Sequence, residues 1–223
     1  DLQHHFIDRH ISSPPKLAIA VIMVFYLLAS VINTRIPRTD APLQPLPKNI
    51  FSLLPEFWQC NKLLWQDKLG QISLASTTVF WGVSGNLRYL VLAWAAAALR
   101  YTEPQAATLE GVVAIGTALG AVWASRIRLE RALDVMPLGI AMGLVTLLLI
   151  PIKTLWLAVP VFIMLGGLGG FLVVPMNAML QHRGHSLMGA GRSIAVQNFN
   201  EQAAILGLGV AYSFITKCGI GVY

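Results

Sequence analysis

The chain has 223 residues, of which 56% are hydrophobic and 12% are charged, and its mean hydropathy is +0.65. An ordinary soluble domain carries about 25% charged residues, so this composition excludes a soluble globular protein and indicates an integral membrane protein. The formal net charge of +6 is explained by basic loops on one side of a membrane. Nucleic-acid binding is not expected, because no basic residues cluster with aromatic residues on a polar segment.

Several apolar stretches approach or exceed the roughly 20 residues that a helix needs to cross a bilayer. We predict spans at Leu17–Ile32, Ile72–Leu99, Thr108–Ala124, Val135–Ile152, Leu155–Leu180 and Ser193–Thr216. The sequence therefore predicts an all-α membrane protein with about six transmembrane helices.

The uneven spacing of these spans divides the chain into three predicted parts. Residues 1–32 form an external leader with one transmembrane helix, residues 33–71 a cytoplasmic linker, and residues 72–223 a bundle of five transmembrane helices. The linker segment Ile50–Trp65 has large apolar residues near helical spacing, which fits either an amphipathic helix in the membrane interface or an ordered loop packed on helix ends. Because the chain does not begin with Met, we expect it to be part of a longer protein.

Basic residues predict the orientation of the spans. Loops 33–71, 125–134 and 181–192 carry ten lysines and arginines, and the segments on the other side carry five. The positive-inside rule places the first set in the cytoplasm. Cys60 and Cys218 then lie on opposite sides of the membrane and are not expected to form a disulfide.

Arg88 lies deep inside the predicted span Ile72–Leu99. A charged side chain at the centre of a transmembrane helix costs about 2.5–3.5 kcal/mol on insertion scales, and such residues often mark a substrate or ion pathway. Thr77, Trp81, Ser84 and Arg88 are separated by four, three and four residues, so they share one helix face that suits the wall of a polar cavity. The alternative is a structural arginine that neutralises Glu201 or extends to the membrane interface.

The last predicted span is unusually polar. Ser193, Gln197 and Glu201 are four residues apart and share one face, and Asn200 lies next to it. Glu201 can pair with Arg88, bind a cationic amine or take up a proton. The alternative is that these groups only form hydrogen bonds between helices.

Glycine pairs of the GxxxG type occur in three adjacent spans and predict close helix packing. They are Gly116 with Gly120, Gly139 with Gly143, and Gly166 with Gly170. The glycine-rich run around Gly166 lies inside an apolar helix with no strand before it, which excludes a nucleotide-binding loop. The histidines show no metal-binding spacing, and no His-x4-Asp or Gly-x-Ser-x-Gly motif is present. We therefore predict no enzyme activity, no metal and no cofactor.

Three longer motifs resemble the bacterial lysophospholipid transporter family of the major facilitator superfamily. They are Val79–Arg88, Gly169–Gln181 and Gly189–Glu201, which resemble the seventh, tenth and eleventh spans of that family; Val31–Pro37 resembles the exit of the sixth. The resemblance implies a fragment that covers about the sixth to the eleventh span of a twelve-span transporter.

The resemblance also implies a function. Members of this family move lysophosphatidylethanolamine and lysophosphatidylglycerol across the bacterial inner membrane, where a separate acyltransferase/acyl-carrier-protein synthetase restores the missing acyl chain. Arg88 would then receive the lipid phosphate, and Glu201 would balance charge or meet the ethanolamine amine. The other expected substrate-binding residues are Gln197, Asn200, Trp81, Ser84 and Thr77.

Two other functions fit the same sequence. A proton-driven drug or metabolite exporter of the same superfamily would use Glu201 as the proton carrier. A membrane scaffold that docks an acyltransferase through its cytoplasmic loops would move no lipid.

Overall fold

The computed structural model describes residues 14–36 and 50–218. The chain divides into two compact units, Asp1–Leu46 and Pro47–Tyr223. Within the described residues every regular element is a helix, which confirms the predicted all-α fold class.

The first unit contains the helix α2 (Pro14–Asn33). Its residues 16–33 have a mean hydropathy of 2.1, and the side chains of these residues are exposed. A helix of this length that is apolar on all sides is typical of a membrane span. The Thr34 hydroxyl donates to the Val31 carbonyl at 2.7 Å where the helix ends.

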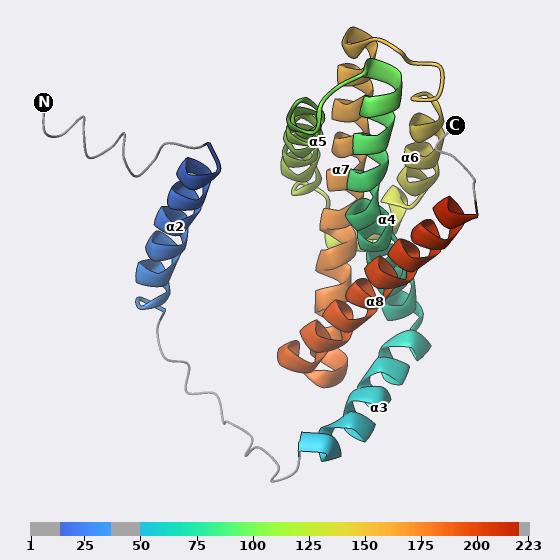
Figure 1. Cartoon of the computed structure of the whole chain (residues 1–223). Coiled ribbons are helices and arrows are strands. Elements are labelled where there is room, and N and C mark those ends of the chain that lie inside the picture. The colour runs from blue at the N-terminus through green and yellow to red at the C-terminus, as the bar shows by residue number, and fades with distance from the viewer. Residues whose placement is uncertain (1–13, 37–49, 219–223) are drawn as a thin grey trace, which may run out of the picture. The chain divides into compact units, whose positions relative to one another are not determined.

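The second unit is a helical bundle with the helix α3 at one end. Its elements are the 3-10 turn η1 (Ile50–Ser52), α3 (Leu53–Gln66), α4 (Lys68–Leu99), α5 (Glu103–Ala124), the 3-10 segment η2 (Leu129–Val135), α6 (Pro137–Leu147), α7 (Leu155–Met188) and α8 (Ala190–Lys217). Figure 1 shows α4 and α7 side by side in the middle of the bundle, with α8 crossing obliquely and α3 at one end.

Local backbone and side-chain features mark three of the helix boundaries. The Asp67 carboxylate accepts a hydrogen bond from the Gly70 backbone N–H at 2.8 Å and so caps the start of α4. Arg100 ends α4 with a left-handed backbone, φ 55°. The Gln105 side chain then accepts from the Thr102 backbone N–H at 3.0 Å and fixes the start of α5.

Each of the six predicted spans contains a helix. Within residues 14–36 and 50–218, three helical segments are long and apolar enough to cross a membrane by themselves. These are Lys16–Asn33, Glu103–Ala124 and Leu155–Met188. The predicted span Val135–Ile152 is much shorter as a helix, because α6 covers only Pro137–Leu147. At 1.5 Å per residue its 11 residues extend about 16 Å, roughly half of the hydrocarbon core.

The backbones of α5 and α7 touch at glycines. A Cβ atom at Gly120 would lie 2.0 Å from the carbonyl oxygen of Gly167, and one at Gly170 would lie 2.1 Å from that of Thr117. Gly116 and Gly166 are equally confined, with hypothetical Cβ atoms 2.3 and 2.2 Å from carbonyl oxygens of the facing helix. The close packing predicted for these two GxxxG pairs is confirmed.

The third glycine pair makes no such contact, so that prediction is wrong. A Cβ at Gly143 would meet no atom within 4 Å, and one at Gly139 would first meet Leu172 at 3.9 Å. The reason is that the glycine face of the short helix α6 borders an open groove beside α4 rather than a helix backbone.

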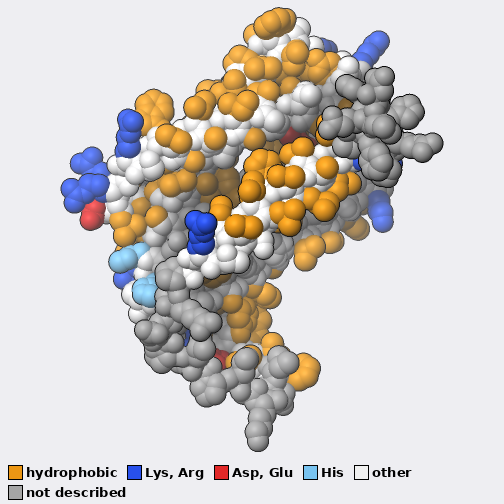
Figure 2. Space-filling model, turned by 90° about the vertical axis from the view of Figure 1, so that its left-hand side faces the viewer, with side chains coloured by type: hydrophobic (Ala, Val, Ile, Leu, Met, Phe, Trp, Pro, Cys, Tyr) orange, Lys and Arg blue, Asp and Glu red, His pale blue; other side chains and the backbone are white. Residues whose placement is uncertain are grey.

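Buried apolar side chains hold the two ends of the bundle. At one end the Trp94 ring packs edge-on against Phe162, 5.6 Å between ring centroids, and the Trp94 Nε1–H donates to the Leu149 carbonyl at 3.2 Å. At the other end α3 is joined to α4, α7 and α8 by fully buried residues: Leu64, Leu74, Leu180 and Val196. Hydrophobic side chains also cover much of the outer surface drawn in Figure 2, as expected of helices that face lipid.

Candidate functional site

A cluster of polar side chains lies where α4, α7 and α8 meet. We call Thr77, Asn177, Gln197 and Glu201 the polar centre. The Gln197 Nε2 donates to the Glu201 Oε1 at 2.8 Å and to the Asn177 Oδ1 at 2.9 Å. The Thr77 hydroxyl donates to the Leu74 carbonyl at 3.2 Å and lies beside the Glu201 carboxylate. The cluster therefore links three helices through one carboxylate and one amide.

The helical repeat explains how α8 contributes to this cluster. Gln197 and Glu201 are one turn apart, so their side chains point to the same side of α8. Both side chains are 8% exposed, and Thr77 of α4 is completely buried. Among the described residues no lysine or arginine lies within ion-pair distance of Glu201. A buried carboxylate with only neutral donors is suited to accept a proton or a cationic group.

Arg88 is not part of the polar centre. Its Nε lies 3.2 Å from the Glu110 Oε1 of α5, and the Arg88 side chain is 65% exposed. The alternative in which Arg88 neutralises Glu201 is wrong for this structure. The reason is distance along α4: Arg88 follows Thr77 by eleven residues, which is about 16 Å of helix, and Thr77 is the residue level with Glu201.

The stripe predicted on α4 does not line a single cavity. Thr77 is buried in the polar centre, whereas Trp81 is 39% exposed and makes an edge contact with Phe80, 5.4 Å between ring centroids. Ser84 is half-buried and borders the apolar groove between α4 and α6. The residues share a face as predicted, but different neighbours meet that face along its length.

Asn200 joins α8 to α3 instead of entering the polar centre. Its Nδ2 donates to the Asn61 Oδ1 at 2.8 Å, and its Oδ1 accepts from the Trp65 Nε1 at 3.2 Å. Its side chain therefore contacts α3 rather than Gln197 or Glu201, and its role in substrate binding stays a prediction.

Two polar residues of this region were not predicted as site residues. Glu110 is an acidic side chain inside an apolar span, which is the same signal that singled out Arg88. Asn177 follows Pro175 in the predicted span Leu155–Leu180, whose other residues are apolar or glycine. Both could have been found by searching every span for isolated polar groups.

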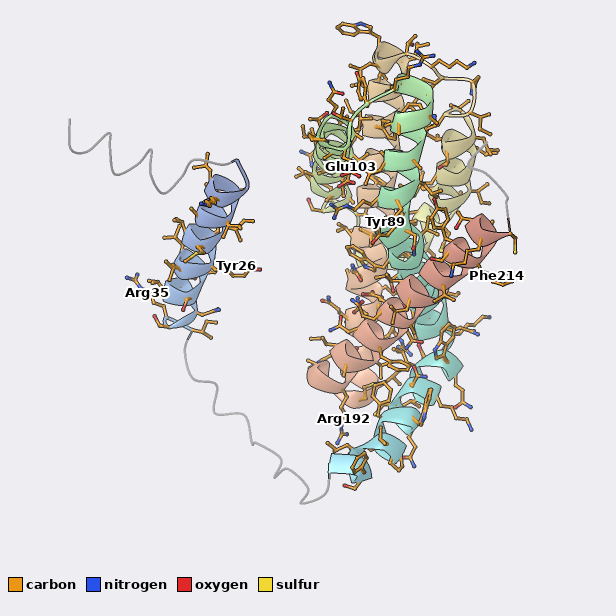
Figure 3. The ribbon with its side chains drawn as sticks, in the orientation of Figure 1. Tyr26, Arg35, Tyr89, Glu103, Arg192 and Phe214 are labelled. Atoms are coloured by element: carbon orange, nitrogen blue, oxygen red, sulfur yellow. The ribbon has the colours of Figure 1, made fainter. Side chains whose placement is uncertain are left out.

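Ion pairs fasten the end of the bundle that carries α3. The Arg183 Nε donates to the Asp67 Oδ2 at 3.0 Å, and a second nitrogen of Arg183 contacts Oδ1. These hydrogen bonds hold the pKa of the Asp67 carboxyl below its usual value. Arg192, at the start of α8 beside α3 in Figure 3, pairs with Glu56.

The described part of the chain holds no group of three or more His, Cys, Asp or Glu side chains that could bind a metal ion. Among the predicted site residues, the polar groups that could meet a ligand are Arg88, which pairs with Glu110, and the polar centre. The Arg88 guanidinium can bind an anionic group, and the Glu201 carboxylate can bind a cationic group or a proton.

Comparison with known proteins identifies relatives of this chain. It is 35% identical over 207 residues to the lysophospholipid transporter LplT of Pectobacterium carotovorum subsp. carotovorum (strain PC1), covering 92% of this chain and 51% of that relative. The LplT proteins of Yersinia pestis (strain Pestoides F) and Yersinia pseudotuberculosis serotype O:3 (strain YPIII) are each 36% identical with the same coverage.

The chain spans about half the length of the curated relatives it matches. No family model matches it, and no solved structure is similar. The resemblance indicated by the sequence motifs is confirmed: over nearly its whole length this chain is similar to the bacterial lysophospholipid transporters LplT.

Proposed function

We propose that this chain is part of a lysophospholipid transporter of the major facilitator superfamily. Its cargo would be lipids such as lysophosphatidylethanolamine and lysophosphatidylglycerol, moved across the bacterial inner membrane for re-acylation by an acyltransferase. The observation that carries the proposal is the similarity to LplT proteins over 92% of the chain.

Arg88 is the residue best suited to the lipid phosphate. Its Nε faces Glu110, and the side chain is 65% exposed, so the terminal N–H groups remain accessible to a ligand. A guanidinium matches a phosphate with two parallel hydrogen bonds, which a lysine cannot reproduce. Glu110 would balance the charge of Arg88 in the absence of lipid and give way when a phosphate binds.

Glu201 would act at a different stage from Arg88. About 16 Å of helix separates Arg88 from Thr77, and Thr77 is the partner of Glu201. Arg88 pairs with Glu110 and Glu201 with Gln197, so the two charged groups belong to different contacts. We therefore assign binding of the lipid phosphate to Arg88. Glu201 would bind either the head-group amine, after the lipid has moved further along its path, or a proton that drives transport.

Transport in proteoliposomes made with the full-length protein tests the role of Arg88. Because hydrogen bonds to charged groups contribute about 1.5–3 kcal/mol, Arg88→Ala should reduce lysolipid uptake roughly 10- to 100-fold, and Arg88→Lys should restore part of it. Arg100→Ala, which removes an exposed arginine at the end of α4, should transport normally. Normal uptake by Arg88→Ala would refute this role, and absence of uptake by the unaltered protein would refute the function.

A proton-coupled exporter is the second candidate, and the lack of a cationic partner for Glu201 among the described residues favours it. An exporter of this kind should stop when the proton gradient is dissipated, and Glu201→Gln should uncouple it. Lysolipid transport that is unaffected by both changes would reject proton coupling.

The same proposal includes an arrangement in the membrane. Residues 1–32 would be a leader and one span, residues 33–71 a cytoplasmic linker, and residues 72–223 the remaining spans of a multi-pass inner-membrane protein. Cys60 is buried and Cys218 is exposed, so a membrane-impermeant maleimide should label Cys218 from the periplasm. Labelling of Cys218 only after the membrane is opened would reverse the orientation.

A further inference from the structure

An apolar groove runs along the outside of the α5–α7 contact. Its volume is about 710 Å³, and Leu119 and Trp123 of α5 and Met164 and Leu168 of α7 line it. Trp123 is 70% exposed. The volume is within the range of small-molecule sites, about 300–1,000 Å³, and the walls are apolar enough to accept a hydrocarbon chain.

Arginines stand at one end of this groove. Arg126 lines both the groove and a second hollow of about 520 Å³, whose other lining residues include Arg128, Glu130 and Arg131. The Arg128 Nε lies 3.3 Å from the Glu130 Oε2. Across residues 14–36 and 50–218, no carboxylate lies within ion-pair distance of Arg126 or Arg131.

The order of these features along the chain matches the depth of a bilayer. The groove follows residues 116–123 of α5 and 163–171 of α7, which lie inside helices able to cross a membrane. Arg126 follows the end of α5 at Ala124, and Arg131 lies in the next element, η2. The apolar groove thus ends at two guanidinium groups that have no carboxylate partner among the described residues. They lie beyond the end of a helix able to cross a membrane, which is the depth of the lipid phosphates.

We propose that this groove binds an anionic phospholipid of the surrounding bilayer, with an acyl chain along α5 and α7 and the phosphate on Arg126 and Arg131. The net positive charge at the end of the groove favours an anionic head group over a zwitterionic one. Neither Arg88 nor Glu201 lines the groove or the hollow. The site is therefore separate from the proposed transport site. Its test does not depend on whether the protein transports lysophospholipids.

Trp123 gives a direct measurement of groove occupancy. The full-length protein is reconstituted in vesicles containing brominated phosphatidylglycerol or, in a parallel sample, the same fraction of brominated phosphatidylcholine. Bromine quenches tryptophan fluorescence on contact, and the difference between the unaltered protein and Trp123→Phe isolates the Trp123 emission. Phosphatidylglycerol should quench this emission at lower lipid fraction, with a preference on the order of tenfold from two arginines.

Charge variants test whether the two arginines cause the preference. Arg126→Gln combined with Arg131→Gln should quench equally with both lipids. Arg100→Gln combined with Lys153→Gln, which removes two cations elsewhere in the bundle, should keep the preference. If the first double variant does not fold, the unaltered protein at about 1 M salt replaces it, because the Debye length then falls to about 3 Å and the preference should weaken strongly.

Two outcomes would overturn the proposal. Equal quenching of Trp123 by both lipids in the unaltered protein at low salt would show apolar contact without head-group recognition. Failure of either lipid to quench Trp123 would show that protein covers the groove, from another segment or a second copy of the chain.

Discussion

The helix pairs α5–α7 and α4–α8 are held together in opposite ways. Between α5 and α7 the backbones touch at glycines, where a Cβ at Gly120 would lie 2.0 Å from a carbonyl oxygen. Between α4 and α8 the contact is made by side chains: the Asn86 Nδ2 donates to the Ile205 carbonyl at 3.1 Å, and Thr77 lies beside the Glu201 carboxylate.

This difference indicates which helix contact can rearrange. A dry backbone contact loses its packing when the helices separate, and nothing replaces it. Polar side chains can exchange one hydrogen-bond partner for water or a ligand at small cost. If the chain acts in the proposed transporter, we therefore expect α5 and α7 to move as one body and α8 to shift against α4.

The largest loss of stability is expected from a substitution that disrupts the glycine contact between α5 and α7. Gly120→Ala places a methyl group against the Gly167 carbonyl, so it should lower the free energy of unfolding by about 3 kcal/mol. Thermal unfolding in detergent measures the loss. Gly143→Ala, where a Cβ has open space, is the control and should leave the midpoint unchanged; equal midpoints for the two variants would contradict the close contact.

A smaller effect is expected at the ion pair that joins the start of α4 to α7. Asp67→Asn removes a charged partner of Arg183 and should cost about 2 kcal/mol at neutral pH. Because the folded pKa of Asp67 is lowered, the unaltered protein should keep this contribution above the unfolded value of about 3.9 and lose it progressively as the pH falls below that value. Unfolding midpoints between pH 7 and pH 3 measure it, and Asp67→Asn should flatten this part of the profile. A profile with the same slope in both proteins would assign the acid loss to other groups.

A single substitution in the polar centre should lower the free energy of unfolding by less than the two substitutions above. Gln197→Leu removes the hydrogen bonds to Asn177 and Glu201, and hydrogen bonds between transmembrane helices contribute only about 0.6–1.7 kcal/mol. We expect a loss of about 1 kcal/mol in unfolding free energy. Asn198→Leu, at an exposed position of the same helix, serves as its control. A loss as large as that of Gly120→Ala would remove the distinction between the two helix pairs.

The smallest effect is expected at the exposed ion pair Arg128–Glu130, whose side chains are 81% and 72% exposed. Glu130→Gln should change the unfolding free energy by less than about 0.5 kcal/mol, since water and salt screen such pairs. A larger change, measured by the same unfolding assay, would show that η2 depends on this pair.

Much of the local structure could be predicted from the sequence, and much of the site could not. Each predicted apolar stretch contains a helix, although several helices extend beyond the predicted bounds, and two of the three glycine pairs make the predicted contact. The stripe Thr77, Trp81, Ser84 and Arg88 lies on one helix, yet its members meet α8, open surface, the α6 groove and α5 in turn. A helical repeat predicts which residues share a face but not which neighbour covers it.

The sequence by itself determined that this is an all-helical membrane protein with charged and polar groups inside apolar helices, because hydropathy and helical spacing act over short stretches of chain. Only the tertiary structure decided that Arg88 pairs with Glu110, that Glu201 is held by Thr77 and Gln197, and that Asn200 binds α3. Helix rotation and axial position set these partners, and both follow from the packing of whole helices that lie far apart in the sequence.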